Sequence, residues 1–380
     1  MWGCLLLVIL ALAAHAEDFP QGTIVDSVKC AADSSQSYAL YLPSNYSPDR
    51  PWSLILGFDP RARGRTPVER YQAAAETYGY IVAGSNNSSN ASWEKSMLAV
   101  QAMAADVGAR FRIDEKRVYT AGLSGGARVA LGVALGTDRI AGVIASSAGY
   151  PDSKPRKSVP FVIFGTAGTE DFNYLELHQL DRALTTPHHL AIFEGGHTWL
   201  SSDLAVQAIE WMEIQAMKSG KRVRDEALID KIFAARLARA EAQPNEKDIC
   251  EALVSIDQDF TGLKDVSKVA ARESELKQRK TVKAGLKKDL SQEQREERLR
   301  EEFGAAEAGL SDPGTRGQSL GELKNWLADL SRKAEAPNDS DDRRMARRLL
   351  RGALASSVAR ARDPEYGKLL DKYRPAGRPF

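Results

Sequence analysis

Short apolar runs separated by longer segments constrain the fold of this chain more than any other feature. Between residues 23 and 218 the runs lie at 37–42, 53–58, 80–83, 118–121, 142–145, 161–164 and 190–193. Several segments between them, such as 68–78, 94–107 and 125–135, are long enough for helices. Apolar strands that alternate with helices are typical of a mostly parallel sheet covered on both faces. We therefore expect a doubly wound α/β domain.

The density of charged residues changes near residue 220. Residues 221–380 contain 34 Lys and Arg and 29 Asp and Glu, whereas residues 1–220 contain 18 and 22. Apolar residues in the charged part recur at helical spacing, and 277–303 predicts a long exposed helix or a partly disordered segment. We predict an α/β domain at 17–218 and an all-α C-terminal domain at 219–380. The net charge of +1 offers no general attraction for nucleic acid or an anionic membrane.

An apolar run of ten residues, 5–14, lies near the start and leads into Ala14-His15-Ala16. The run is too short to span a bilayer comfortably, and the small residues that follow suit a signal peptidase. We expect residues 1–16 to be a cleaved export signal and the protein to be secreted or periplasmic, with no membrane span. Cys30 and Cys250 then remain, and they either pair in an oxidising compartment or stay as buried thiols.

A serine lies at the apex of a strand–turn–helix pattern. The run 118–121 leads through Gly122-Leu-Ser-Gly-Gly126 into a helical segment that starts at Ala127. A serine held in a strained turn of this kind needs glycines two positions to either side, because side chains there would clash. The pattern therefore predicts that Ser124 is a nucleophile.

Two further polar groups follow later strands. Asp171 lies in the loop after the sixth apolar run, and His197 follows two glycines after the seventh. Functional groups of such sheets collect at the carboxyl ends of the strands. A serine, a histidine that takes its proton and a carboxylate that orients the histidine make an acyl-transfer triad. We predict Ser124, His197 and Asp171 for these roles, and Glu170 or Asp152 remain alternative carboxylates.

On these motifs the chain resembles the α/β-hydrolase superfamily. The segment 121–126 is similar to its nucleophile elbow, the Asp171 loop to its acid position and 195–199 to its histidine loop. The segments 38–43 and 111–118 resemble the exported feruloyl esterases and polyhydroxyalkanoate depolymerases. For the α/β part of the chain, this resemblance implies an α/β-hydrolase fold and a serine esterase.

The oxyanion site departs from the pattern of that group. Where the group carries His-Gly after the third strand, this chain reads Leu56-Gly-Phe-Asp-Pro60. The oxyanion donors would then be the backbone N–H of Gly125 and that of Phe58 or Asp59. Ser124 would attack an ester carbonyl, and water would hydrolyse the acyl-enzyme. No step calls for a metal or an organic cofactor, and the chain has no zinc-type Cys/His spacing.

The residues constrain the substrate less than the chemistry. Arg61, Asn86 and Trp199 are candidates for substrate binding, since they lie in loops that follow strands. Only about ten residues separate Gly149 from Val159, where many lipases insert a lid, and this short connection favours an open site. An ester that is polymeric or linked to a carbohydrate suits such a site.

Two other classes of function stay open. One is a serine peptidase of the prolyl-oligopeptidase type, although nothing in the chain resembles the propeller domain of those enzymes. The other is a non-catalytic interaction protein on a hydrolase scaffold, against which an intact triad argues. The charged C-terminal region suits a protein or cell-envelope partner. Since no histidine follows His197, we predict that a chain ending near Gly220 keeps its chemistry.

Overall fold

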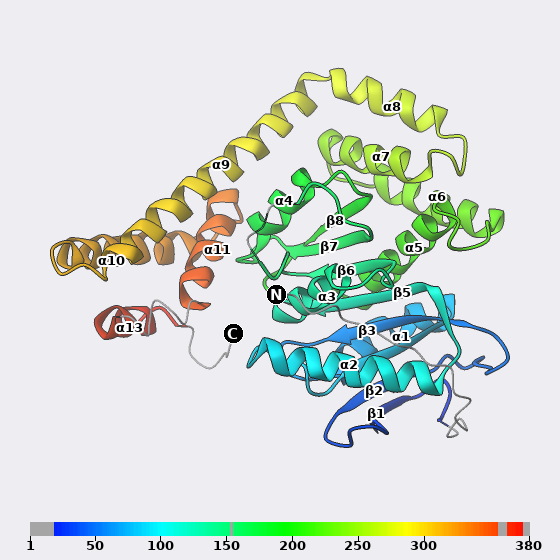
Figure 1. The fold of residues 1–380 in the computed structure, drawn as a ribbon. Coiled ribbons are helices and arrows are strands. Elements are labelled where there is room, and N and C mark those ends of the chain that lie inside the picture. The colour runs from blue at the N-terminus through cyan, green and yellow to red at the C-terminus, as the bar shows by residue number, and fades with distance from the viewer. Residues whose placement is uncertain (1–18, 153, 155, 356–362, 375–380) are drawn as a thin grey trace. The chain divides into compact units, whose positions relative to one another are not determined.

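The computed structural model describes residues 19–152, 154, 156–355 and 363–374, and its centre is one β-sheet (Figure 1). The predicted export signal at 1–16 lies outside these residues. In the described chain eight strands form the sheet in the order β1-β2-β4-β3-β5-β6-β7-β8. The strands are β1 (Ile24–Lys29), β2 (Ser37–Tyr41), β3 (Trp52–Phe58), β4 (Tyr80–Ser85), β5 (Ile113–Leu123), β6 (Gly142–Ser146), β7 (Val162–Gly168) and β8 (His188–Phe193).

Most neighbouring strands of this sheet run parallel. The pairs β4–β3, β3–β5, β5–β6 and β6–β7 are parallel, whereas β1–β2 and β2–β4 are antiparallel. Strand β8 continues the parallel set. The Ile163 N–H donates to the Pro187 carbonyl, and the Thr169 N–H donates to the Phe193 carbonyl. The difference in residue number is the same for both pairs, as it is between parallel strands. The loops that follow β5, β7 and β8 therefore leave the sheet at its carboxyl edge.

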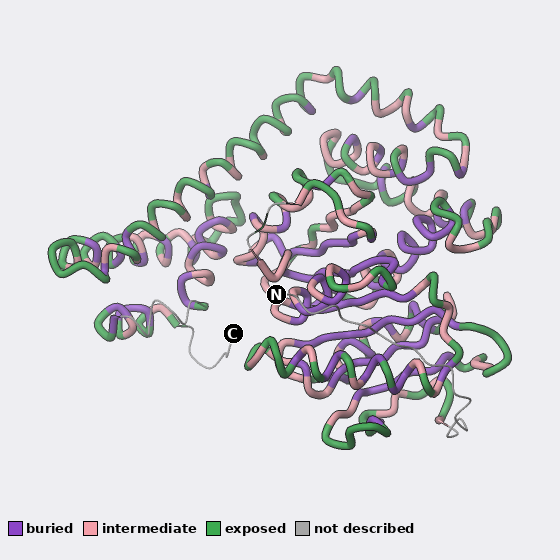
Figure 2. The backbone as a smooth tube through the Cα atoms, viewed as in Figure 1, coloured by how far each residue is buried: buried purple, intermediate pink, exposed green. Residues whose placement is uncertain are grey.

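Helices cover both faces of the sheet (Figure 1). Along β3, Leu54 and Leu56 belong to one apolar core and Ile55 to the other, because successive side chains of a strand point to opposite faces. Four helices complete the two cores. Helices α2 (Trp93–Arg110) and α3 (Gly125–Leu135) pack in the core that contains Leu54, and α1 (Arg65–Tyr78) and α5 (Ser202–Lys218) pack in the core that contains Ile55. Burial on both faces explains why the central strands read as continuous apolar runs (Figure 2).

Three further helices belong to the same compact unit as the sheet, α6 (Glu226–Glu241), α7 (Glu246–Phe260) and α8 (Ser267–Gln278). Asp259 of α7 accepts hydrogen bonds from two side chains of α5, the Trp211 indole at 2.9 Å and the Gln215 amide at 2.7 Å. Helix α5 is consequently buried at every position from Ala208 to Met217.

The second compact unit contains helices from the end of the chain together with two loops, Gly168–Leu175 and Ile192–His197. Its helices are α9 (Lys280–Gly309), α10 (Arg316–Ala334), α11 (Asp341–Ala355) and α13 (Pro364–Asp371). The first unit comprises the chain up to Ala167, with Glu176–Ala191 and Thr198–Arg279, and α4 (Tyr174–Ala183) begins in one unit and continues in the other. The last boundary between the units lies at 279/280, whereas the composition changes near residue 220. Packing joins α7 to α5 in the first unit.

The architecture confirms the predicted doubly wound, mostly parallel α/β sheet followed by a helical region. A mostly parallel, doubly covered sheet carries a serine turn between β5 and α3. Cys30 and Cys250 are buried free thiols, the second of the two alternatives for these residues. Among the described residues, no helix combines the length and hydropathy needed to cross a membrane.

Candidate active site

Ser124 sits in a strained turn between the last residue of β5 and the first residue of α3. Its backbone adopts φ 54° and ψ −121°, which is uncommon for a residue with a side chain. The conformation is held from both sides, since the Ser124 N–H donates to the Ser146 carbonyl at 2.8 Å and its carbonyl accepts from the Arg128 N–H at 3.1 Å. A half-buried serine is thus presented at the carboxyl end of a central strand.

Two glycines make this turn possible. A Cβ atom added at Gly122 would lie 2.2 Å from the backbone of Gly126, and one added at Gly126 would lie 2.0 Å from the Phe58 carbonyl oxygen. Both distances are far inside van der Waals contact. The need for glycine at these positions, expected from the sequence, therefore has a direct steric cause.

The loop after β3 lies against this turn. The Asp59 backbone nitrogen is 3.4 Å from the Cβ position of Gly126. The Phe58 side chain is fully buried. The sequence predicted the N–H of Phe58 or of Asp59 as a second oxyanion donor. Of these two groups, the Asp59 N–H is the one found beside the serine turn.

The buried Asp59 carboxylate fixes this loop. It accepts hydrogen bonds from the Arg61 N–H, the Arg63 guanidinium and the Trp199 indole N–H, each at 2.9 Å. Burial alone would raise the pKa of Asp59, but these hydrogen bonds outweigh it and hold the pKa below its usual value. The Asp59 side chain is therefore a charged anchor for the backbone of this loop.

The three predicted substrate-binding residues lie in different settings. Trp199 is buried and supports Asp59 from within the core. Asn86 donates to the Asp26 carbonyl at 3.1 Å and to the Ser37 hydroxyl at 3.2 Å. These contacts tie it to the region of β1 and β2. Arg61 is exposed on the loop after β3.

Asn90 is the last residue of the polar run 85–90, and the sequence did not place it beside the serine. Its backbone N–H donates to the Pro60 carbonyl at 2.9 Å. A Cβ atom added at Gly125 would lie only 1.7 Å from the Asn90 side-chain oxygen. An exposed carboxamide thus covers the residue after the serine. No local sequence signal marks it, because the contact joins segments more than thirty residues apart.

Asp171 and His197 form a hydrogen-bonded pair. His197 Nδ1 lies 2.9 Å from Asp171 Oδ1, the aspartate side chain is fully buried and the histidine side chain is 20% exposed. The Phe172 ring stacks on the imidazole at 4.1 Å between centroids. The Asn173 N–H also donates to Asp171, at 2.8 Å. An imidazole oriented through Nδ1 keeps Nε2 for a reacting group.

The alternative carboxylates have other partners. Glu170 forms ion pairs with Arg347 and Arg351, and Asp152 accepts two hydrogen bonds from the Arg156 guanidinium, at 2.6 and 2.9 Å. Asp171 is the carboxylate of the three that is observed to contact His197.

His189 is one of two histidines in β8 and is half-buried. Its Nδ1 lies 3.0 Å from the Ser255 hydroxyl, and burial together with the charge of Arg236 lowers its pKa to about 4. Among the described residues, no three His, Cys, Asp or Glu side chains gather as metal ligands would.

No protein-family model and no curated protein matches this chain. Solved structures resemble it at low identity. One is a thermostable esterase, at 19% identity and a TM-score of 0.39, over 49% of this chain and 61% of the esterase. Another is a thermophilic esterase from the planctomycete Thermogutta terrifontis, at 14% and 0.38, over 56% and 100%. A third is dipeptidyl peptidase 4 from Porphyromonas gingivalis, at 15% and 0.38, over 50% and 35%.

Proposed function

We propose that this protein is a serine hydrolase that cleaves carboxylic esters through an acyl-enzyme. The observation that carries the proposal is the strained Ser124 at the carboxyl end of β5, in a chain whose β7 and β8 are followed by a hydrogen-bonded Asp171–His197 pair. A nucleophile, a base and a carboxylate that orients the base are the groups that acyl transfer requires.

In the proposed reaction His197 Nε2 takes the proton of the Ser124 hydroxyl, because Nδ1 is held by Asp171. The serine Oγ bonds to the ester carbonyl carbon, and the oxyanion accepts hydrogen bonds from the N–H groups of Gly125 and Asp59. Each such donor stabilises the transition state by about 3 kcal/mol. The C–O bond to the alcohol then breaks, and the alcohol leaves with the proton from His197. Water attacks the acyl-enzyme in the same way and restores the serine.

The substrate part of the proposal rests on sequence motifs. The segments 38–43 and 111–118 resemble exported feruloyl esterases and polyhydroxyalkanoate depolymerases, and the run 5–14 resembles an export signal. We infer an enzyme that acts outside the cytoplasm on polymeric or carbohydrate-linked esters. Cell fractionation tests the location, and a panel of acetyl, feruloyl and hydroxyalkanoate esters beside peptide substrates tests the bond that is cleaved.

Replacing Ser124 tests the chemistry directly. We expect Ser124→Ala to lower hydrolysis of a short-chain nitrophenyl ester by ~10³-fold or more, since the nucleophile is lost. The wild type is expected to take up a fluorophosphonate probe on the peptide that contains Ser124. Cleavage by the variant at more than a few per cent of the wild-type rate, with circular dichroism unchanged, would remove Ser124 from the mechanism.

A further inference from the structure

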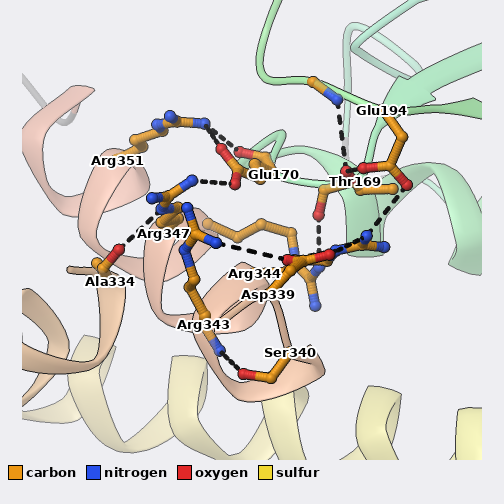
Figure 3. A network of polar contacts seen from close by, with 12 residues as sticks. Thr169, Glu170, Glu194, Ala334, Asp339, Ser340, Arg343, Arg344, Arg347 and Arg351 are labelled. Carbon is orange, nitrogen blue, oxygen red and sulfur yellow. Dashed lines mark hydrogen bonds and ion pairs between the residues drawn. The ribbon is translucent and has the colours of Figure 1, made fainter. Parts of the chain in front are cut away.

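Four arginines of α11 lie on one face of that helix. Arg344, Arg347, Arg348 and Arg351 follow an i, i+3, i+4, i+7 spacing, which places their side chains on the same side of the helix. They belong to the compact unit that also contains the loops Gly168–Leu175 and Ile192–His197. Figure 3 shows that the labelled arginines of this face reach toward Glu170 and Glu194.

Backbone carbonyls on both sides of Asp171 accept hydrogen bonds from arginines of the C-terminal helices. The donor–acceptor pairs are Arg348 to Thr169 at 2.7 Å, Arg351 to Glu170 at 3.0 Å and Arg300 of α9 to Phe172 at 2.8 Å. Hydrogen bonds from charged donors are stronger than neutral ones. The path of the loop through Asp171 is therefore set by side chains more than a hundred residues further along the chain.

Ion pairs reinforce these hydrogen bonds. The Glu170 carboxylate pairs with both Arg347 and Arg351, the second at 3.0 Å, and Arg344 pairs with Glu194 at 3.2 Å (Figure 3). Glu170 is only 16% exposed, so these contacts are better shielded from solvent than those of surface pairs.

Arg348 is the most buried of the four arginines, at 8% exposure. It is neutralised by Glu296 of α9, whose carboxylate is 2.9 Å from Nε. A buried charge is tolerated only when it is paired and hydrogen-bonded. The Arg348 guanidinium is thus held in one position, from which it donates a hydrogen bond to the Thr169 carbonyl.

We propose that the arginines of α9 and α11 are positioning residues for the Asp171–His197 pair. They hold the backbone on either side of Asp171, and Phe172, held by Arg300, stacks on the His197 ring. The proposal deepens the proposed hydrolase function and rests on it. A misplacement of about 1 Å in such a pair costs on the order of 10²-fold in rate.

The test uses the full-length chain and leaves the buried Arg348 in place. The double variant Arg347→Gln, Arg351→Gln removes both cations from Glu170, and Glu170→Gln removes the anion without changing the helices. The matched control is Arg332→Gln on α10, whose side chain is 76% exposed and pairs with Asp329. Steady-state kinetics on a nitrophenyl ester and the pattern of kcat against KM are measured for each.

A second readout does not depend on activity. In protein labelled with ¹⁵N-histidine, the hydrogen-bonded Nδ1 proton of His197 is expected to give a downfield resonance that Asp171→Asn removes. The double variant is expected to broaden or lose that resonance and to lower kcat tenfold or more with KM within twofold. Arg332→Gln is expected to keep both, and added methylguanidinium should partly restore the kcat of Arg347→Ala, Arg351→Ala.

The proposal is overturned if the double variant, folded as judged by circular dichroism, keeps the resonance and a kcat within twofold of the wild type. If the double variant does not fold, the test passes to Glu170→Gln. The proposal is then overturned if Glu170→Gln keeps the resonance and a kcat within twofold of the wild type. A wild type that shows the resonance but cleaves no ester would reject the hydrolase function and leave the positioning role to be decided by the resonance alone.

Discussion

Asp59 is the residue whose charge state matters most for the loop after β3. Its carboxylate is buried and gathers three hydrogen-bond donors, one of them the Trp199 indole. Because its pKa in the folded protein is held below the usual value, the ionised form stabilises the fold. The stabilisation is fully present above the unfolded value of about 3.9 and is lost as pH falls through the lower folded value.

We expect Asp59→Asn to lower the free energy of unfolding by about 2 kcal/mol near neutral pH, the size of a hydrogen bond to a charged group. The difference from the wild type should shrink as pH falls below about 3.9, because the unfolded wild-type chain then takes up a proton on Asp59 before the folded protein does. Thermal unfolding of both proteins from neutral pH down to pH 3 measures it. A difference that stays constant down to pH 3 would mean that the charge of Asp59 is not the source of the effect.

Residues with a strong local pattern could be predicted from the sequence, whereas residues defined by distant contacts could not. The expectation for Ser124 came from glycines within two positions of it. Asn90 beside Gly125 had no comparable local signal. Trp199 was predicted to bind substrate because it lies in a loop that follows a strand, but its indole is buried and donates a hydrogen bond to Asp59. Sequence spacing places a residue near a strand end without giving the direction of its side chain.

At the scale of elements, the turn between β5 and α3 is the most sterically restricted. We expect Gly122→Ala to lower the free energy of unfolding by about 1–3 kcal/mol, since its Cβ would overlap the backbone of Gly126. Gly136→Ala, at the end of α3, is the matched control, because the nearest atoms to its Cβ position are at an ordinary 3.5 Å. Urea unfolding compares the two variants. Equal stability of both would show that the turn relaxes at little cost.

Edge elements and surface elements were harder to foresee than central ones. Strand β1 was not predicted, because its sequence IVDSVK is mostly solvent-facing and contains no continuous apolar run. The segment 277–303, for which a long exposed helix or a partly disordered segment was predicted, is mostly in α9, a helix of 30 residues of which Val282, Glu296 and Ala306 are buried. Two of its contacts to other elements are made by charged side chains, Arg300 and Glu296. The sequence therefore offered few apolar positions from which its packing could be predicted.

At the scale of the whole molecule, the compact units change the expectation for a chain that ends near Gly220. Such a chain lacks α7, so that Trp211 and Gln215 of α5 lose Asp259 and their cover. We expect it to melt well below the full-length protein or to aggregate. A chain that ends at Arg279 retains α6–α8 and is expected to melt higher than the shorter one. Differential scanning calorimetry compares them, and equal melting temperatures would favour the boundary at 218/219.

The arginine contacts of α11 also set an order of events during synthesis. Arg347 and Arg351 meet Glu170 across 177 and 181 residues of chain, so these bonds form only after α11 has left the ribosome. The serine turn needs only local and central-strand contacts and is complete much earlier. A nascent polypeptide therefore forms the Ser124 turn long before it can fix the Asp171–His197 pair. In the proposed mechanism, acyl transfer would begin only once α11 has docked on Glu170.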